Sequence, residues 1–412
     1  MEIVLINFGG TDDNKALINS KNNLNGLSYL VLALYSMFIF LQVVSNSSWH
    51  FFIRLGNLVS PLSRINIVIL MIMFAVSCLR EWNVKQFIGT AILFAFLLAY
   101  YFKYSSNFFS IFLASILVGM SIEPMKLLRI DFYARLVAVS FIVLLSLLNI
   151  LPRNGGAGVY TGFYYSVFSY GFTWSSILGY LIFIIFVEFI LLFRVRHLIL
   201  FVVITLYAIF QLSIGYMTGF IGGALGIILL ILSHRKFHQF SRATLLLYPC
   251  LFSLTVYVSF WFNQSSENWS FWNNLISLRM PIWQYYVQNW PINLFGNSIP
   301  SQNNIISGSV IGHGALDGGY IYFLMKYGLL AILVIYALII AAYYTKKEVG
   351  QTSNDVFWIF CILSVLSAFS ETSPFLVYFS PFAFLLGSAT FYREDSKNND
   401  IKYWKETNLT HE

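Results

Sequence analysis

The sequence predicts an all-α protein that crosses a membrane about twelve times and carries one large polar loop late in the chain. Apolar residues make up 58% of its 412 residues, and charged residues make up only 10%. The mean hydropathy is +0.73. A water-soluble fold cannot bury that much apolar surface, so the composition indicates a polytopic membrane protein.

The apolar residues gather in runs close to the roughly 20 residues that a helix needs to cross the hydrocarbon core. Polar segments separate two blocks of these runs: an N-terminal tail (1–26), a large loop (263–318) and a C-terminal tail (392–412). Nine predicted spans fall in 27–262 and three in 319–391, near residues 27–45, 58–79, 86–102, 107–122, 133–151, 174–193, 197–214, 216–232, 243–262, 319–344, 355–370 and 374–391.

The distribution of basic residues predicts the orientation. With the N-terminus in the cytoplasm, 18 of the 24 Lys and Arg residues fall on the cytoplasmic side and 6 on the outside. Cytoplasmic loops carry the excess of Lys and Arg in membrane proteins. Both termini are therefore expected in the cytoplasm, and the loop 263–318 is expected on the outer face. The six outer residues are Arg54, Arg64, Lys103, Arg153, Arg279 and Lys326.

Two features lie inside the predicted spans. Glycines four residues apart, at 215/219, 219/223 and 222/226, let helix backbones approach closely. We expect them to pack against helices of the same chain rather than to form a dimer interface. Glu188 lies six residues before Arg194, and we favour an ion pair between them near the cytoplasmic interface over a proton-relay role for Glu188.

The outer loop contains a segment with helical periodicity, residues 277–290, in which Ile282, Tyr286 and Trp290 recur every four residues. We expect this aromatic stripe to lie on the membrane surface. Arg279 opens the segment. Its guanidinium is suited to binding a phosphate through two hydrogen bonds, and a solvated Arg279 is the alternative.

The loop ends in a glycine-rich stretch around His313 and Asp317, which are four residues apart and share a face in a helical turn. A neutral imidazole or a carboxylate can take a proton from a sugar hydroxyl. The alternative is that Asp317 caps the next helix and His313 is solvated. Lys326 follows within the predicted span, facing either the bundle interior or, by snorkelling, the interface. Glu371 ends the next span, so Asp317, Lys326 and Glu371 are expected at one depth.

The stretch Leu316–Gly328 (Leu-Asp-Gly-Gly-Tyr-Ile-Tyr-Phe-Leu-Met-Lys-Tyr-Gly) resembles the Asp-Asn-x-Tyr and Lys-Tyr-Gly segment of Wzy-type O-antigen and capsule repeat-unit polymerases, which are related to the O-antigen ligases. Arg279, Trp283 and Gly296 are similar to the family's Arg…Trp…Gly pattern, and Ser370-Glu371 to its late Ser-Glu pair. Gly318 stands where the family has Asn.

The resemblance implies a glycosyltransferase of the bacterial plasma membrane that joins glycans carried on undecaprenyl pyrophosphate by metal-independent, inverting transfer. It implies no cofactor and no nucleic-acid partner. The implied partners are lipid-linked glycans, the bilayer, a chain-length regulator and a flippase. The implied catalytic residues are His313 and Asp317, with His313 as the expected base. The implied substrate-binding residues are Arg153, Arg279, Tyr320, Lys326 and Glu371.

Two alternatives are an O-antigen ligase and a flippase or other transporter of lipid-linked oligosaccharides. The His-Pro-His-Asn-like signature of the ligases is not found in the sequence. A transporter is expected to carry charges deep within several spans and an internal repeat, and the predicted spans show neither.

Overall fold

A computed structural model describes residues 11–48, 56–79, 84–103, 108–153, 155–160, 163–193, 197–236, 238–263, 265–276, 279–299, 316–346 and 351–391. Fifteen α-helices dominate this part of the chain. They are α1 (Thr11–Ser45), α2 (Gly56–Cys78), α3 (Val84–Lys103), α4 (Phe108–Gly119), α5 (Pro124–Leu147), α6 (Ser175–Leu192), α7 (His197–Ser213), α8 (Met217–Lys236), α9 (His238–Trp261), α10 (Glu267–Leu275), α11 (Met280–Asn289), α12 (Gly319–Tyr327), α13 (Leu329–Lys346), α14 (Gln351–Ser367) and α15 (Phe382–Phe391).

The helices are those of an all-α membrane protein. Five contain stretches long and apolar enough to cross a membrane: Gly26–Ser45, Gln86–Lys103, Pro124–Leu147, Ser175–Leu192 and Phe240–Trp261. Shorter apolar helices are Leu62–Cys78, Phe108–Gly119, Leu198–Ser213, Met217–Leu229, Leu329–Thr345, Val356–Ser367 and Phe382–Phe391. Each predicted span overlaps one of these apolar helices.

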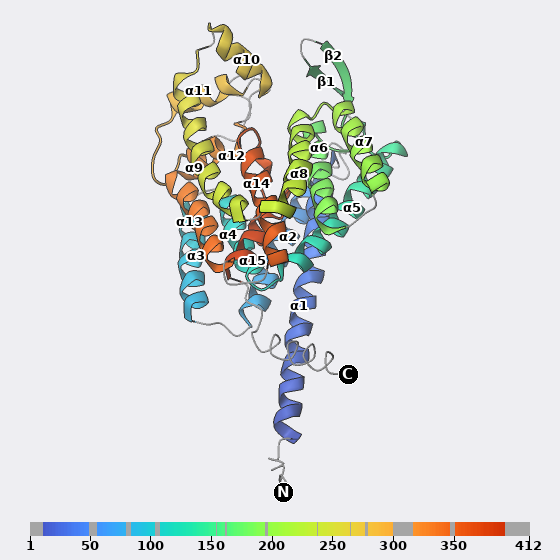
Figure 1. Cartoon of the computed structure of the whole chain (residues 1–412), viewed down its shortest axis with the longest axis vertical. Coiled ribbons are helices and arrows are strands. Elements are labelled where there is room, and N and C mark those ends of the chain that lie inside the picture. The colour runs from blue at the N-terminus through green and yellow to red at the C-terminus, as the bar shows by residue number, and fades with distance from the viewer. Residues whose placement is uncertain are drawn as a thin grey trace.

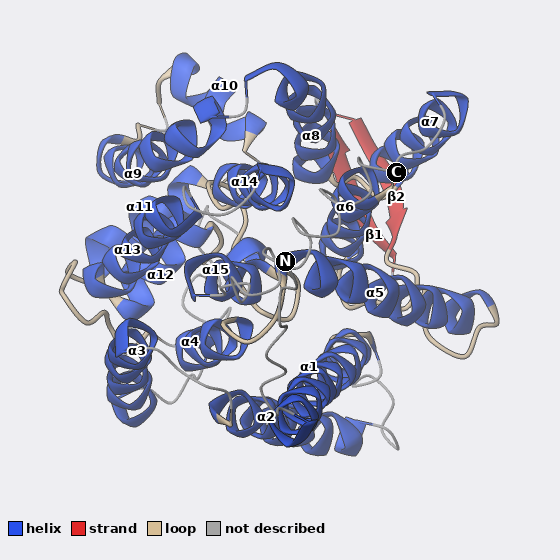
Figure 2. Cartoon of the chain, turned by 60° about the horizontal axis from the view of Figure 1, so that its bottom comes forward, coloured by secondary structure: helices blue, strands red, loops and turns tan. Residues whose placement is uncertain are grey.

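The helices form a bundle with two distinct ends (Figure 1). The first turns of α1 project from one end, and α10 with the strands β1 (Gly155–Tyr160) and β2 (Phe163–Phe168) lies at the other. Figure 2 shows the short helix α15 in the middle, beside α4 and α14, with the longer helices around it.

Several predicted boundaries were wrong. Helix α1 begins at Thr11 and so includes most of the expected N-terminal tail. Helix α5 begins at Pro124, nine residues before the predicted span, because the apolar side chains of Leu127 and Leu128 pack inside the bundle at 0% exposure. Asp131 and Arg135 therefore lie inside a helix and not in a cytoplasmic loop.

The antiparallel hairpin β1–β2 was not predicted. The sequence carries little signal for β1 (Gly-Gly-Ala-Gly-Val-Tyr), because glycine is depleted in strands, whereas β2 (Phe-Tyr-Tyr-Ser-Val-Phe) is rich in β-prone aromatic residues.

The predicted span 319–344 is broken at Gly328 into α12 and α13. Gly328 has φ +87°, a left-handed conformation that favours glycine. A Cβ there would overlap the main chain of Leu294 and Gly296. The segment 293–297 instead forms hydrogen bonds with the backbone at the break: the N–H of Asn297 donates to the carbonyl of Met325 at 2.9 Å, and the N–H of Leu329 donates to that of Asn293 at 3.1 Å. Helix α12 is nine residues long, about half the length of a membrane span.

The last predicted span, 374–391, is also interrupted. It contains a short 3₁₀ turn (Ser373–Phe375), an irregular stretch, and then α15. Helix α15 crosses α4 at two glycines, Gly119 and Gly387, where a Cβ would overlap the carbonyl oxygens of Phe384 and Ile116 respectively. The centre of the bundle thus depends on direct contact between two helix backbones.

The glycine-rich stretch of α8 packs within the chain, as predicted. A Cβ at Gly219 would strike the ring of Tyr216, one at Gly222 the ring of Phe183, and one at Gly223 the ring of Tyr207. The absence of side chains on this face therefore makes room for aromatic rings of α6, α7 and the turn that precedes α8.

Gly387→Ala tests the α4–α15 contact. We expect it to destabilise the fold by at least about 2 kcal/mol, because the added methyl group meets backbone that cannot move aside. Gly26→Ala is the matched control, since its Cβ meets nothing within 4 Å. Thermal unfolding of the two purified variants measures the difference, and equal unfolding temperatures would contradict this account of the crossing.

Candidate functional site

Three charged side chains from separate parts of the chain meet near the α10 end of the bundle. Arg279 immediately precedes α11, Asp317 lies two residues before α12, and Glu371 follows α14. None of the three belongs to a membrane-length helix. With Thr218 of α8 and Thr372, which contact the carboxylates, they form what we call the Arg279 cluster.

Asp317 accepts five hydrogen bonds. Its Oδ1 accepts from the backbone N–H of Gly318 at 2.9 Å, and from the N–H and the hydroxyl of Thr372, both at 3.0 Å. Its Oδ2 accepts from Nε and Nη2 of Arg279 at 3.2 and 3.0 Å. Asp317 does not cap α12 with its side chain; it joins three segments.

Arg279 bridges two acids and a carbonyl. Its Nη2 also donates to Oε1 of Glu371 at 2.8 Å, and its Nη1 donates to the carbonyl of Ile276 at 3.0 Å. The side chain is 13% exposed. Burial by itself lowers the pKa of Arg279, and the charges of Glu371 and Asp317 more than offset this, so that its pKa is raised. The guanidinium is thus occupied mainly by carboxylates, which was not predicted.

Glu371 is the most buried acid of the cluster, with a side chain only 6% exposed. Its Oε1 accepts from Arg279 and, at 3.2 Å, from the hydroxyl of Thr218. Burial and the neighbouring charge of Asp317 raise the pKa of Glu371 to about 8, and the contacts with Arg279 and Thr218 offset only part of this rise. Glu371 can therefore gain or lose a proton near neutral pH, as an acid–base catalyst must.

Aromatic packing holds the cluster in place. The indole N–H of Trp283 donates to the backbone carbonyl of Asp317 at 2.6 Å, and its ring is fully buried. Met280, Tyr286 and Val287 on the same helix are buried as well. The expectation that this stripe lies on the membrane surface was therefore wrong, because α11 packs its apolar face onto α9 and α12.

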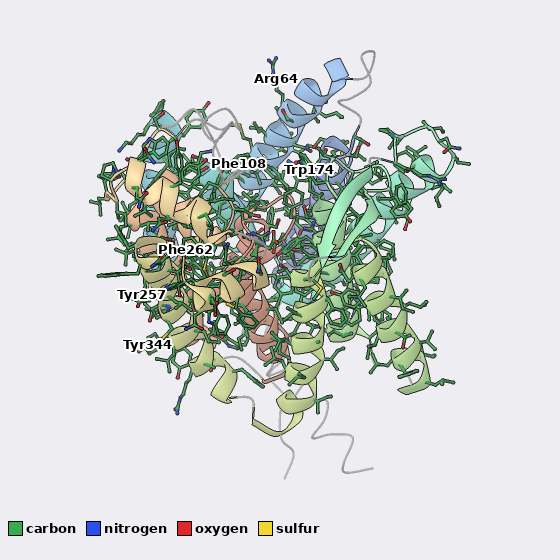
Figure 3. All side chains as sticks on the ribbon, turned by 90° about the horizontal axis from the view of Figure 1, so that it is seen from above. Arg64, Phe108, Trp174, Tyr257, Phe262 and Tyr344 are labelled. Carbon is green, nitrogen blue, oxygen red and sulfur yellow. The ribbon has the colours of Figure 1, made fainter. Side chains whose placement is uncertain are left out.

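An apolar cavity of about 650 Å³ adjoins the cluster. It lies between α8, α9 and α14, at the end of the bundle that carries α10 (Figures 1 and 2). Thr218 and Ser370 line it where it meets Glu371, and Ile276, whose carbonyl binds Arg279, lines it as well. On the α9 side, Tyr257 lies at the edge of the bundle, as seen from the α10 end (Figure 3). The cavity therefore offers an apolar compartment with a polar rim.

The structure brings together Asp317, Glu371 and Arg279 but not Lys326. The Lys326 ammonium contacts the hydroxyl of Tyr322 at 3.1 Å and lies 5.6 Å from the ring centre of Phe108, which is partly buried against the core. It belongs to the last turn of α12, about 13 Å along the helix from Asp317. Lys326 faces the bundle interior, as predicted, but at a different depth.

Tyr320 and Arg153 are placed apart from the cluster too. Tyr320 is 0% exposed, and its hydroxyl donates to the carbonyl of Val365 at 2.9 Å. It fills the core between α9, α12 and α14, and the substrate contact that the resemblance implies for it stays a prediction. Arg153 donates to the carbonyl of Leu147 at 3.1 Å and so caps α5. His313 lies outside the described residues.

Sequence reasoning missed Thr218, Thr372 and the supporting role of Trp283. The available signal was weak: Thr218 is a polar residue within a glycine-rich apolar stretch, and Thr372 directly follows Glu371. Among the residues that the structure describes, no group of three or more His, Cys, Asp or Glu side chains is arranged to hold a metal ion.

The fold and the cluster together define a helical membrane protein with a buried cluster of charged side chains beside an apolar cavity. Comparisons with protein families, with curated proteins and with solved structures find no match.

The pKa of Glu371 predicts a pH-dependent stability. The folded chain keeps a proton on Glu371 that the unfolded chain loses near pH 4.5, so this contribution is complete below pH 4.5 and is lost as the pH rises through about 8. We expect the wild-type unfolding temperature to fall across this window more than that of Glu371→Gln. Parallel profiles of the two proteins in a thermal unfolding series would contradict the assignment.

Proposed function

We propose that this chain polymerises lipid-linked oligosaccharide repeat units on the outer face of the bacterial plasma membrane. The observation that carries the proposal is the position of an acid–base cluster at the rim of an apolar cavity within a membrane bundle. A substrate with a polyprenyl tail and a polar head needs both compartments side by side. The resemblance of Leu316–Gly328 to the Wzy-type polymerases supports the same activity.

The substrate tail would enter the cavity between α8 and α9. Its walls carry aliphatic side chains, among them Ile221, Leu254 and Leu363. Burying each methylene group of a lipid there contributes about 0.8 kcal/mol. The diphosphate would then lie near Thr218, Ser370 and the Arg279 guanidinium. Arg279 binds an anion with two hydrogen bonds only if one of its carboxylate contacts opens.

The proposed reaction forms a bond between the acceptor hydroxyl oxygen and the anomeric carbon of the donor. The bond from that carbon to the diphosphate oxygen breaks, and the electron pair leaves with the diphosphate. The hydroxyl proton passes to a base. Glu371, with its pKa of about 8, joins His313 as a candidate for this role. Asp317 is saturated with donors and acts as the positioning partner.

The topology of the proposed enzyme has twelve spans with both termini in the cytoplasm. The twelve apolar helices and the excess of basic residues on one side support it. Arg135 no longer counts toward that excess because its side chain is fully buried inside the bundle. The cluster and the β1–β2 hairpin then face the outside.

A proton-coupled transporter is the second candidate, and one observation favours it. Asp131 and Arg135 in α5 and Glu188 in α6 are all fully buried within membrane-length helices. Buried charges within several spans are what we expect of a transporter, and the sequence analysis did not predict them for this chain.

The first functional test is complementation of a strain that lacks the gene. Loss of a polymerase leaves surface glycan of a single repeat unit, whereas loss of a flippase or ligase leaves none. We expect wild type to restore long chains and Arg279→Ala to fail, because the lost charge-assisted bonds are worth roughly 1.5–3 kcal/mol, or about tenfold to a hundredfold in rate.

Arg279→Lys is expected to be nearly as harmful, since an ammonium cannot bridge two carboxylates and a carbonyl in one plane. Arg64→Ala is the matched control, because this arginine is exposed on α2 and projects away from the bundle (Figure 3). Long glycan chains made by a normally expressed Arg279→Ala protein would remove Arg279 from the site.

Ile221→Trp tests the cavity as the site of the lipid tail. The indole would displace at least two methylene groups of the tail, a loss of about 1.6 kcal/mol, and so weaken donor binding by about tenfold or more. Ile231→Trp on the same helix is the control, because Ile231 is 65% exposed and does not line the cavity. The KM for purified lipid-linked units, measured in isolated membranes, should rise only for Ile221→Trp; equal values would place the tail elsewhere.

A further inference from the structure

A second group of charged side chains lies inside the bundle, away from the Arg279 cluster. It consists of Tyr35 of α1, Asp131 and Arg135 of α5 and Glu188 of α6, all 0% exposed, and we call it the α5–α6 charge cluster. Asp131 and Arg135 are one turn apart and form an ion pair at 2.5 Å. The Tyr35 hydroxyl donates to the other oxygen of Asp131 at 2.5 Å. Arg135 also donates to the backbone carbonyl of Tyr378 at 3.1 Å.

The charges of this cluster do not balance. One guanidinium faces two carboxyl groups, and Asp131 takes both of the close donors, the Arg135 guanidinium and the Tyr35 hydroxyl. No N–H or O–H group of the described residues donates to either oxygen of Glu188, whose nearest polar neighbour is the carboxyl group of Asp131, and Nη2 of Arg135 has no acceptor. The charged groups that act on Glu188 are Asp131 and Arg135. An ionised Glu188 would be an uncompensated charge in the membrane interior, which costs several kcal/mol.

A neutral Glu188 removes this cost by carrying a proton. The pairing with Arg194 that the sequence favoured finds no support in the structure, since Arg194 lies outside the described residues and Glu188 faces α5. The hydroxyl of Tyr180, two turns from Glu188 on α6, is also buried and has no hydrogen-bond partner within the described chain. The charges of both Arg135 and Glu371 act on it, and the Ser380 and Ser367 hydroxyls lie beside it. The buried Tyr180 hydroxyl is therefore close enough to both clusters to interact with a charge of each.

We propose that the α5–α6 charge cluster is a binding site for one exchangeable proton, which Glu188 holds, and that Tyr180 links it to Glu371. When Glu188 releases its proton toward the Arg279 cluster, each hydroxyl group that links the two sites, that of Tyr180 among them, accepts one proton and gives up another. Only the two carboxyl groups change charge: Glu188 becomes a carboxylate and Glu371 becomes an acid. The proposal concerns Glu188 and does not depend on polymerase activity.

Infrared spectroscopy of the full-length chain in lipid nanodiscs tests the site. A protonated carboxyl group has its own carbonyl band, and we expect one such band to be lost in Glu188→Gln. Glu123→Gln is the control, because Glu123 lies at the exposed start of α5 and pairs with Lys126 at 2.9 Å. Glu371→Gln identifies the band of the second buried acid, Glu371, so that it is not confused with that of Glu188. The Glu371 band should vanish as the pH rises past about 8. An unchanged spectrum of Glu188→Gln overturns the proposal.

Thermal unfolding shows whether Glu188→Gln is folded and how stable it is relative to wild type. Glutamine has the shape of a protonated Glu188, so Glu188→Gln should unfold at no lower temperature than wild type. A clearly lower temperature overturns the proposal, because only a charged and paired Glu188 would lose an interaction on substitution.

The link to Glu371 is tested by transfer into D₂O, where the Glu188 band shifts as the proton is replaced. We expect Tyr180→Phe to slow this shift by about tenfold, or about 1.4 kcal/mol in the barrier. Tyr248→Phe is the control, since Tyr248 is equally buried but binds the carbonyl of Ile332. A band that never shifts, or one that shifts at the wild-type rate in Tyr180→Phe, overturns the exchange path.

Discussion

The carboxylate of Asp317 is the interaction on which the α10 end of the bundle depends. Its five hydrogen bonds join the start of α11, the start of α12 and the segment after α14. Arg279, before α11, lies 38 residues from Asp317 along the chain, and Thr372, after α14, lies 55 residues from it. Through Arg279 the same carboxylate also fixes Glu371. Because one charged group satisfies so many donors, removing it would leave a buried guanidinium short of a partner, which costs more than one lost hydrogen bond.

This arrangement requires interrupted helices. A continuous membrane helix satisfies its own backbone and leaves no N–H groups for a ligand or a side chain. The breaks at Gly328 and between the 3₁₀ turn and α15 bring irregular backbone into the bundle, where the segment 293–297 and the loop after α14 satisfy it. Glycines make these contacts because a Cβ would collide with a neighbouring backbone. As a result of these interruptions, α4, α12 and α15 are short, and the longer helices surround them.

The two charge clusters differ in a way that bears on mechanism. In the Arg279 cluster every acid has a donor and one acid titrates near neutral pH, as suits a site that exchanges protons with a substrate. In the α5–α6 cluster one acid has no donor among the described residues, as suits a site that stores a proton. Tyr180 lies in the field of both. A membrane enzyme and a proton-coupled transporter can each use such a pair, and the cavity beside the Arg279 cluster favours the enzyme.

The sequence alone determined the membrane class, the position of the apolar helices and the internal packing of the α8 glycines, and it singled out Arg279, Asp317 and Glu371 as candidate site residues. These follow from hydropathy, spacing and the scarcity of charged residues, which are local properties. Only the tertiary structure decided that Arg279 binds two carboxylates, that Tyr320 and Trp283 are core residues, and that Lys326 lies at another depth. It also placed Asp131, Arg135 and Glu188 together. Contacts between residues far apart in the chain depend on which helix faces which, and periodicity within one helix does not contain that information.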